Sequence, residues 1–270
     1  MDALYLFRHS IYSDVEIRYS LRSLARHAPY IRKVWVFGDR PEFLTDDTTA
    51  VQHVPHEYIA RVGNFRTPAT NFFLLMFLSS LIPDLDHEYL LFCDDYFLLR
   101  PCGIDEARRV RYLQDLSQVT NRGRGLWREA LWRTYDLLKR LKYTGYNFET
   151  HTPTYLRRRW VFEAYCEFQD FVTEDRWYGM LGITAVLNHA CRHQRLDLMH
   201  LETEGLRGGF WGKPSPDFER VVETCRGKLF LNFDDDAFGL GLWRFLDEQF
   251  PEPCRYERAD AGPLIPPPGP

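Results

Sequence analysis

The sequence lacks the short motifs of several common functional classes. Its six cysteines form no C-x-x-C pair, and its nine histidines show no metal-ligand spacing such as H-E-x-x-H. There is no G-x-x-x-x-G-K-[ST] loop and no G-x-G-x-x-G fingerprint. The absence of G-x-S-x-G argues against a serine hydrolase of that type. A chain this rich in core residues needs no disulfides, so we expect a reduced, intracellular protein.

Long hydrophobic runs are also missing. The most apolar stretch, residues 72–82 (FFLLMFLSSLI), is too short for a membrane span and contains two serines, which predicts a buried helix. No basic segment followed by a long apolar one occurs at the start, so no secretory signal is predicted. We therefore expect a cytoplasmic protein with at most peripheral contact at the inner face of a membrane. The net charge of -4 gives no indication of nucleic-acid binding.

The composition is that of a folded globular protein. Hydrophobic residues make up 45% and charged residues 27% of the 270 positions, which suits one large domain. Aromatic residues reach 16%, enough to fill a core or to line a ligand site.

Strand and helix patterns alternate in the first part of the chain. Apolar runs at 3–8, 32–38 and 88–93 predict buried strands, and residues 15–27 and 69–81 predict helices. This alternation predicts an α/β fold with a largely parallel sheet. Further elements are predicted as a possible strand at 50–54, a strand at 228–233, and helices at 126–141, 154–171, 178–193 and 237–249.

The middle of the chain is basic. Ten Lys and Arg against three acids give residues 122–159 a charge of about +7, whereas the whole chain is negative. This segment either contacts an anionic lipid or polyanionic acceptor, or is a solvated helical insert. We predict one catalytic domain over 1–258 with an insert at about 105–150. The Pro/Gly-rich tail 259–270 is predicted to be disordered.

Adjacent acids follow two of the predicted strands. Asp94 and Asp95 come directly after strand 88–93, where the carboxyl ends of parallel strands face a ligand crevice. Carboxylate oxygens there suit Mg²⁺ or Mn²⁺ bridging a diphosphate, and the alternative is a solvated turn. The run 234–236 (DDD) follows strand 228–233, so one of its acids is predicted to join the crevice while the others cap the next helix.

Two further features have alternative interpretations. His151 lies in a loop before Pro153 and near a basic cluster, where it is either a general base or an incidental histidine. The arginines at 157–159 are either phosphate ligands or a solvated helix face.

Four segments carry a family resemblance when taken together and in order. They are EIRYSLRSLARHAPYIRKVWVF at 16–37, the stretch 65–101 with EYLLFCDDYFLLRP, His151-Thr152-Pro153 with the basic helix after it, and 228–257 ending in FPEPCRYE. This set resembles the Stealth family of sugar-1-phosphate transferases. That family includes bacterial capsular polysaccharide phosphotransferases and the animal lysosomal-enzyme N-acetylglucosamine-1-phosphotransferase.

The resemblance implies a GT-A-like, Rossmann-related α/β fold, a nucleotide-sugar donor, a carbohydrate acceptor and a divalent metal, Mg²⁺ or Mn²⁺. It implies transfer of a hexose- or N-acetylhexosamine-1-phosphate to an acceptor sugar hydroxyl, as in capsular or exopolysaccharide synthesis. By position, the matching residues are the acidic pair Asp94 and Asp95 (catalytic, metal), His151 (catalytic), Arg176 (catalytic, donor phosphate), Asp234 (metal), and Arg18 and Arg22 (donor).

Two departures from the family pattern leave other functions open. The T-W-V-[DN]-G stretch of the first region is replaced by YLFRHS at 5–10, and Cys93 stands where Asn precedes the acidic pair. The alternatives are a metal-dependent GT-A glycosyltransferase that releases the nucleoside diphosphate, or a non-catalytic nucleotide- or carbohydrate-binding relative.

Overall fold

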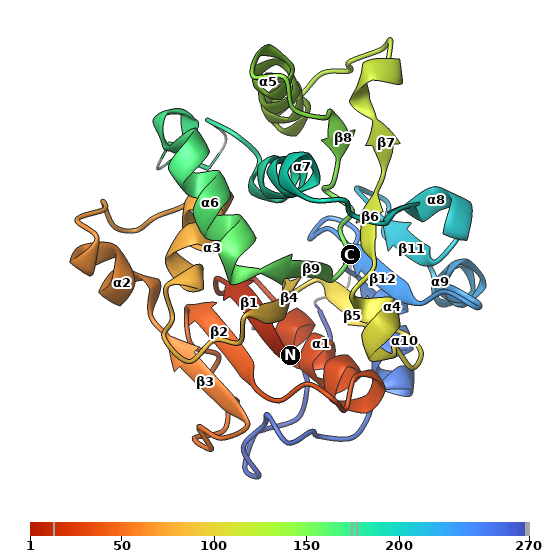
Figure 1. Cartoon of the computed structure of the whole chain (residues 1–270). Helices are drawn as coiled ribbons and strands as arrows, with labels where there is room; N and C mark the ends of the chain where they lie inside the picture. Colours follow the sequence, from red (N-terminus) through yellow and green to blue (C-terminus); the bar gives the residue numbers. More distant parts are fainter. Residues whose placement is uncertain (13, 174, 177, 268–270) are drawn as a thin grey trace.

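A five-stranded sheet lies at the centre of the computed structural model, in the order β3-β2-β1-β4-β9 (Figure 1). The structure describes all residues except 13, 174, 177 and 268–270. Four strands run parallel and the last is antiparallel to its neighbour: β1 (Asp2–Phe7), β2 (Val34–Gly38), β3 (Val51–Val54), β4 (Glu88–Phe92) and β9 (Thr154–Arg157). β1 and β2 are buried throughout, because helices cover both faces of a parallel sheet and every side chain meets the core. The predicted α/β class with a mostly parallel sheet is confirmed.

The helices around this sheet follow from right-handed crossovers. α1 (Val15–His27) connects β1 to β2 on one side, and α3 (Phe72–Ser80) returns from β3 to β4 on the other. α2 (His56–Val62) precedes α3, and α6 (Arg158–Phe168) and α7 (Gly182–His193) pack beside it. α1 has the predicted bounds, because Ile17, Leu21 and Leu24 recur at helical spacing and are all buried.

A smaller three-stranded sheet adjoins the first one. It has the order β11 (Arg207–Phe210), β12 (Phe230–Phe233) and β5 (Tyr96–Leu98), with β12 parallel to β11 and antiparallel to β5. Phe233 stacks on Phe97 and on Phe238, both with ring centroids 5.2 Å apart. α9 (Phe218–Cys225) and α10 (Leu240–Gln249) contribute to this second core. The chain passes from the first sheet to the second between β4 and β5, through Cys93, Asp94 and Asp95.

The middle of the chain forms the remaining elements. α5 (Leu126–Arg140) agrees with the predicted helix over 126–141. The others are short: α4 (Ile104–Ala107), β6 (Val110–Tyr112), β7 (Gln114–Asp115), η1 (Leu116–Gln118), β8 (Tyr146–Asn147), η2 (Gln169–Phe171), β10 (Leu198–His200) and α8 (Leu201–Glu204).

Four predicted helices begin later than expected. Those predicted over 69–81 and 237–249 start at Phe72 and Leu240. The helix predicted over 154–171 starts at Arg158, because Thr154–Arg157 pairs with β4 as the edge strand β9. The helix predicted over 178–193 starts at Gly182. The last three residues of the tail predicted to be disordered lie outside the described residues, while the carbonyl of Gly262 accepts a hydrogen bond from Arg18 Nη1 at 2.7 Å.

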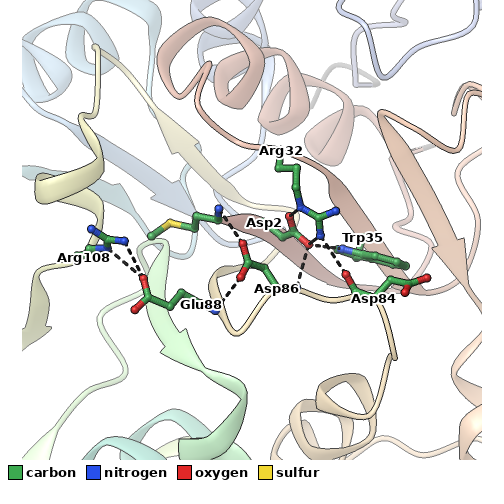
Figure 2. Close-up of polar contacts among 8 residues, drawn as sticks. Asp2, Arg32, Trp35, Asp84, Asp86, Glu88 and Arg108 are labelled. Atoms are coloured by element: carbon green, nitrogen blue, oxygen red, sulfur yellow. Dashed lines mark hydrogen bonds and ion pairs between the residues drawn. The ribbon is translucent and has the colours of Figure 1, made fainter.

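Polar groups at the amino edge of the central sheet are mutually paired (Figure 2). The buried carboxylate of Asp2 accepts hydrogen bonds from Arg32 Nε at 2.9 Å and from Trp35 Nε1 at 2.8 Å. The backbone N–H of Asp86 donates to the same carboxylate at 3.1 Å, and Glu88 accepts from Arg108. This edge is therefore a structural ion-pair network, in which each charge has a partner.

No helix in the described part of the chain is both long and apolar enough to cross a membrane.

Candidate functional site

Acidic residues gather at the opposite, carboxyl edge of the central sheet. β4 ends at Phe92, and the turn that follows carries Asp94 and Asp95, both partly buried. The amide of Asn232, on β12, donates to Asp95 Oδ2 at 3.1 Å. The acidic pair therefore lies where the two sheets meet, at the carboxyl end of a parallel strand, as the sequence predicted.

The environment of this pair favours protonated carboxyls. Desolvation raises the pKa of Asp94, and the negative charge of Asp235 raises it further. Desolvation also raises the pKa of Asp95, with added repulsion from Asp94 and Asp235. Three acids on two segments of the chain thus interact through their charges. The causes of these pKa shifts include no arginine or lysine that neutralises the pair.

Glu16 is a fourth member of this cluster, and sequence reasoning did not select it. It lies in the first turn of α1 and is only 2% exposed, and its Oε2 atom has no hydrogen-bond partner. Burial, together with Asp94, Asp235 and Asp95, raises its pKa to about 9. The signal in the sequence was an acid between Val15 and Ile17, on a helix whose neighbouring positions are apolar.

The acids that follow β12 have separate roles. Both carboxylate oxygens of Asp234 accept from the backbone N–H of Gly212, at 2.9 and 3.0 Å, and Oδ1 also accepts from Ala237 N at 2.9 Å. Asp234 thus holds the turn before α10, in the way an acid caps a helix. The exposed Asp235 is the one whose charge acts on Asp94 and Asp95. Of the three acids, the structure brings Asp235 to the pair, where the sequence favoured Asp234.

His151 lies at the same edge of the sheet. β9 is antiparallel to β4 and pairs Thr154 with Leu91, so the loop before Thr154 lies beside the end of β4. Within that loop, Glu149 adds to the negative field that raises the pKa of the Cys93 thiol. The sheet topology therefore brings the predicted base and the acidic pair to one edge.

The environment of His151 keeps its imidazole neutral. Its ring lies 6.1 Å from the ring of Trp127, centroid to centroid, and its backbone has φ 52°. Burial lowers the pKa of His151 to about 4, and the positive charge of Arg207 contributes. Glu149, two residues earlier, is held by the backbone N–H of Thr184 at 2.9 Å. A neutral imidazole of this kind can accept a proton at physiological pH.

Arg18 and Arg22 do not belong to the site, which corrects their predicted role in donor binding. Arg22 donates to Glu257 through Nε at 2.7 Å and Nη2 at 2.9 Å, and Arg18 Nε donates to the same carboxylate at 2.5 Å. Both guanidinium groups are buried, and Arg22 Nη1 also donates to the carbonyl of Phe250 at 2.9 Å. Their bonding capacity is used to fix the C-terminal segment on α1.

Arg176 lies on an exposed turn, and its neighbours 174 and 177 are outside the described residues. The side-chain amide of Asn71, which caps α3, donates to the carbonyls of Asp175 and Tyr178, both at 3.1 Å. The other end of α3 lies at the amino edge of the central sheet. There Arg158, which is next to the start of β4, donates to the carbonyl of Ser80 at the end of α3. The turn with Arg176 is therefore at the carboxyl-edge end of α3, and its phosphate-binding role stays a prediction.

The acids of this cluster do not form a metal-binding arrangement among the described residues. No three His, Cys, Asp or Glu side chains of the described residues converge closely enough to hold an ion. Two buried oxygens nevertheless lack partners there: Glu16 Oε2 and the Oδ1 atom of Asn232, whose amide nitrogen bonds Asp95.

The fold and the site together define a class of protein: an α/β protein with acids at the carboxyl ends of its strands. Residues 11–114 match the model of Stealth protein conserved region 2, so this part of the chain is similar to that region of the Stealth proteins. The match spans α1, both parallel strands beside β1, and the pair Asp94 and Asp95. The predicted family resemblance is confirmed over this part of the chain.

One curated relative is the exopolysaccharide phosphotransferase SCO2592 of Streptomyces coelicolor (strain ATCC BAA-471 / A3(2) / M145). It is 36% identical over 90 residues, which is 33% of this chain and 9% of that protein. The chain thus matches less than a tenth of that relative's length.

Two solved glycosyltransferases are similar in structure. Apo mouse xyloside xylosyltransferase 1 is similar over 87% of this chain and 98% of its own, with 10% identity and a TM-score of 0.45. Galactosyltransferase LgtC, solved with donor and acceptor sugar analogues, is similar over 94% of this chain and 98% of its own, with 12% identity and a TM-score of 0.48.

Proposed function

We propose that this protein is a sugar-1-phosphate transferase. It moves a hexose- or N-acetylhexosamine-1-phosphate from a nucleotide diphosphate sugar to an acceptor sugar hydroxyl, forming a phosphodiester and releasing the nucleoside monophosphate. The observation that carries the proposal is the acidic cluster around Asp94 and Asp95, within conserved region 2 and beside the His151 loop. The Streptomyces relative, named as an exopolysaccharide phosphotransferase, supports the same reaction class.

The acids fit a divalent cation chemically. Glu16, Asp94, Asp95 and Asp235 repel one another, and the unpartnered oxygens of Glu16 and Asn232 lie among them. Asp94 and Asp95 would hold Mg²⁺ or Mn²⁺, ions that prefer such hard oxygen ligands, with Asp235 and Glu16 supplying further negative charge. When bound, the cation neutralises the donor diphosphate.

His151 acts on the acceptor in this proposal. Its neutral imidazole takes the proton of the acceptor hydroxyl while that oxygen forms a bond to the sugar-linked phosphorus. The bond from this phosphorus to the oxygen of the nucleoside monophosphate breaks, and the electron pair leaves with the nucleotide. Burial, with a contribution from the positive charge of Arg207, lowers the pKa of His151 and so keeps the imidazole from being protonated beforehand.

The released nucleotide tests the proposal. The protein is incubated with Mg²⁺ or Mn²⁺, a panel of nucleotide sugars and an acceptor saccharide, and the products are identified by ³¹P NMR and mass spectrometry. Nucleoside monophosphate together with a new phosphodiester signal is the expected result. Nucleoside diphosphate would instead establish a glycosyltransferase, and no product with any donor would indicate a binding protein.

Neighbouring acids provide a matched pair of variants. Asp235→Asn should lower turnover, because it removes charge that acts on Asp94 and Asp95. Asp236→Asn should leave turnover within about threefold of wild type. Its exposed carboxylate lies 4.0 Å from Lys213 Nζ, and its charge is not among the causes that raise the pKa of Asp94 and Asp95.

A further inference from the structure

A groove lies along α5, apart from the acidic cluster. It has a volume of about 760 Å³, and it separates one face of α5 from Phe171, Gly179 and Met180. Trp132 and Phe171 are among its apolar lining residues. Arg122, Arg133 and Arg140 contribute positive charge, and Glu129 and Asp136 oppose it in part. A cavity of this size, with aromatic walls and a few charged groups, suits an organic ligand of several rings.

The charges of the groove are only partly neutralised. Arg122 forms a two-pronged ion pair with Asp136, at 2.7 and 2.8 Å, and lies over the ring of Trp132. Arg140 lies over the ring of Phe171, with its guanidinium carbon 5.8 Å from the centroid. No carboxylate of the described residues forms an ion pair with Arg140, so its charge faces the groove. The lining thus combines aromatic surface with positive charge.

Hydrogen bonds connect the groove to the His151 loop. The hydroxyl of Thr134, on α5, accepts from the backbone N–H of Leu181, next to the groove wall, at 2.8 Å. α7 begins at the following residue, and its Thr184 N–H holds Glu149. On the other side, Trp127 in the first turn of α5 lies against His151. Figure 1 shows α5 and α7 side by side. The groove and the His151 loop are therefore connected through α5 and α7, but neither Trp127 nor a residue of the loop is among the groove's lining residues.

We propose that this groove binds an anionic oligosaccharide, the acceptor chain of the reaction. The apolar faces of sugar rings pack on aromatic side chains, and arginine binds carboxylate or phosphate groups through its planar fork. The groove is concave, whereas contact with a lipid surface uses a flat or convex face. The proposal rests on the proposed function, because the acceptor of that reaction is a carbohydrate.

Two residues at the end of α5 make a matched test. Arg140 lines the groove, and its exposed neighbour Lys139 does not. Arg140→Glu and Lys139→Glu therefore make the same charge change on the same helical turn. Binding of hexagalacturonate, an anionic hexasaccharide, is measured by calorimetry at low salt, with neutral maltohexaose as the reference ligand and no donor present.

We expect the wild type to bind hexagalacturonate and not maltohexaose, with binding weakened about tenfold by Arg140→Glu and less than twofold by Lys139→Glu. Equal loss in both variants would overturn the proposal, because only general charge would then matter. It would also be overturned by absent hexasaccharide binding, including the case in which phosphatidylglycerol vesicles bind instead. Since no turnover is needed, failure here is distinct from failure of the transferase assay.

Discussion

Replacing Glu16 by glutamine should stabilise the metal-free protein at pH 7.5. Glu16 has a pKa of about 9 in the folded state and an ordinary value of 4.5 when unfolded. The folded protein therefore binds this proton more tightly, so the free energy of unfolding is highest below pH 4.5 and falls as the pH rises toward 9. In the wild type, ionisation of Glu16 lowers the free energy of unfolding throughout the neutral range. Glutamine avoids this loss, because it resembles the protonated acid at every pH.

The magnitude follows from the two pKa values. At pH 7.5 the pH lies about three units above the unfolded value, and each unit corresponds to about 1.36 kcal/mol, so the cost is about 4 kcal/mol. At pH 5 the same linkage gives about 1 kcal/mol. Because Glu16 is only 2% exposed, solvent screening does not reduce these figures much. A difference of 4 kcal/mol is a large part of an ordinary domain's stability.

Urea unfolding in the presence of EDTA measures the effect. Wild type, Glu16→Gln and the exposed control Glu252→Gln are compared at pH 5 and pH 7.5, with equal m-values as the check that only stability changed. We expect the gain from Glu16→Gln to grow by about 3 kcal/mol between the two pH values, and the control to show no such growth. A gain that is independent of pH, or a loss at pH 7.5, would refute the placement of Glu16 among the acids.

Further predictions concern the site and the ion pairs around it. Asp94→Asn should lower turnover by about a hundredfold or more while the far-UV circular dichroism stays that of the wild type; Asp236→Asn is the control. Donor affinity, measured by calorimetry with a nucleotide sugar, should fall on addition of EDTA, and equal affinity with and without chelator would remove the metal from the proposal. His151→Ala should reduce turnover by about 10²–10⁴-fold and abolish the acidic limb near pH 4 of the pH–rate profile, with donor affinity unchanged. Arg22→Met should lower the free energy of unfolding by about 3–5 kcal/mol, because it leaves Glu257 buried with one partner fewer. The control Arg244→Met breaks an exposed ion pair with Glu248 and should lower it by less than about 1 kcal/mol in the same urea assay.

Local patterns predicted the elements whose signals are contained in their own residues. α1, α5 and β4 have strong apolar periodicity or a continuous apolar run, and their bounds agree with prediction to within a residue or two. β5 and β9 have three and four residues, too few to show a period, and they are strands only because neighbouring strands pair with them.

The sequence predicted where the site lies better than it predicted which residues form it. A buried strand followed by Asp94 and Asp95 identified the edge of the sheet, because chain direction determines where a strand's carboxyl end lies. The roles of Arg18 and Arg22 were not predictable, since their partner Glu257 is 239 and 235 positions away in sequence. The sequence likewise could not show that the carboxylate of Asp234 accepts a hydrogen bond from the backbone N–H of Gly212, because no local pattern reveals this contact between distant residues.

The first two turns of α1 connect the acidic cluster with the far end of the chain. Glu16 faces the acids, while Arg18 and Arg22, which follow it on the same helix, bind Glu257, and Arg22 also binds the carbonyl of Phe250. A truncation that removes residues 251–270 would delete no acid of the site. It would, however, remove Glu257 and so leave two buried guanidinium groups without this partner on the helix that carries Glu16. Shortened versions of this protein, or tags fused in place of its final segment, would thus alter the acidic cluster from a distance.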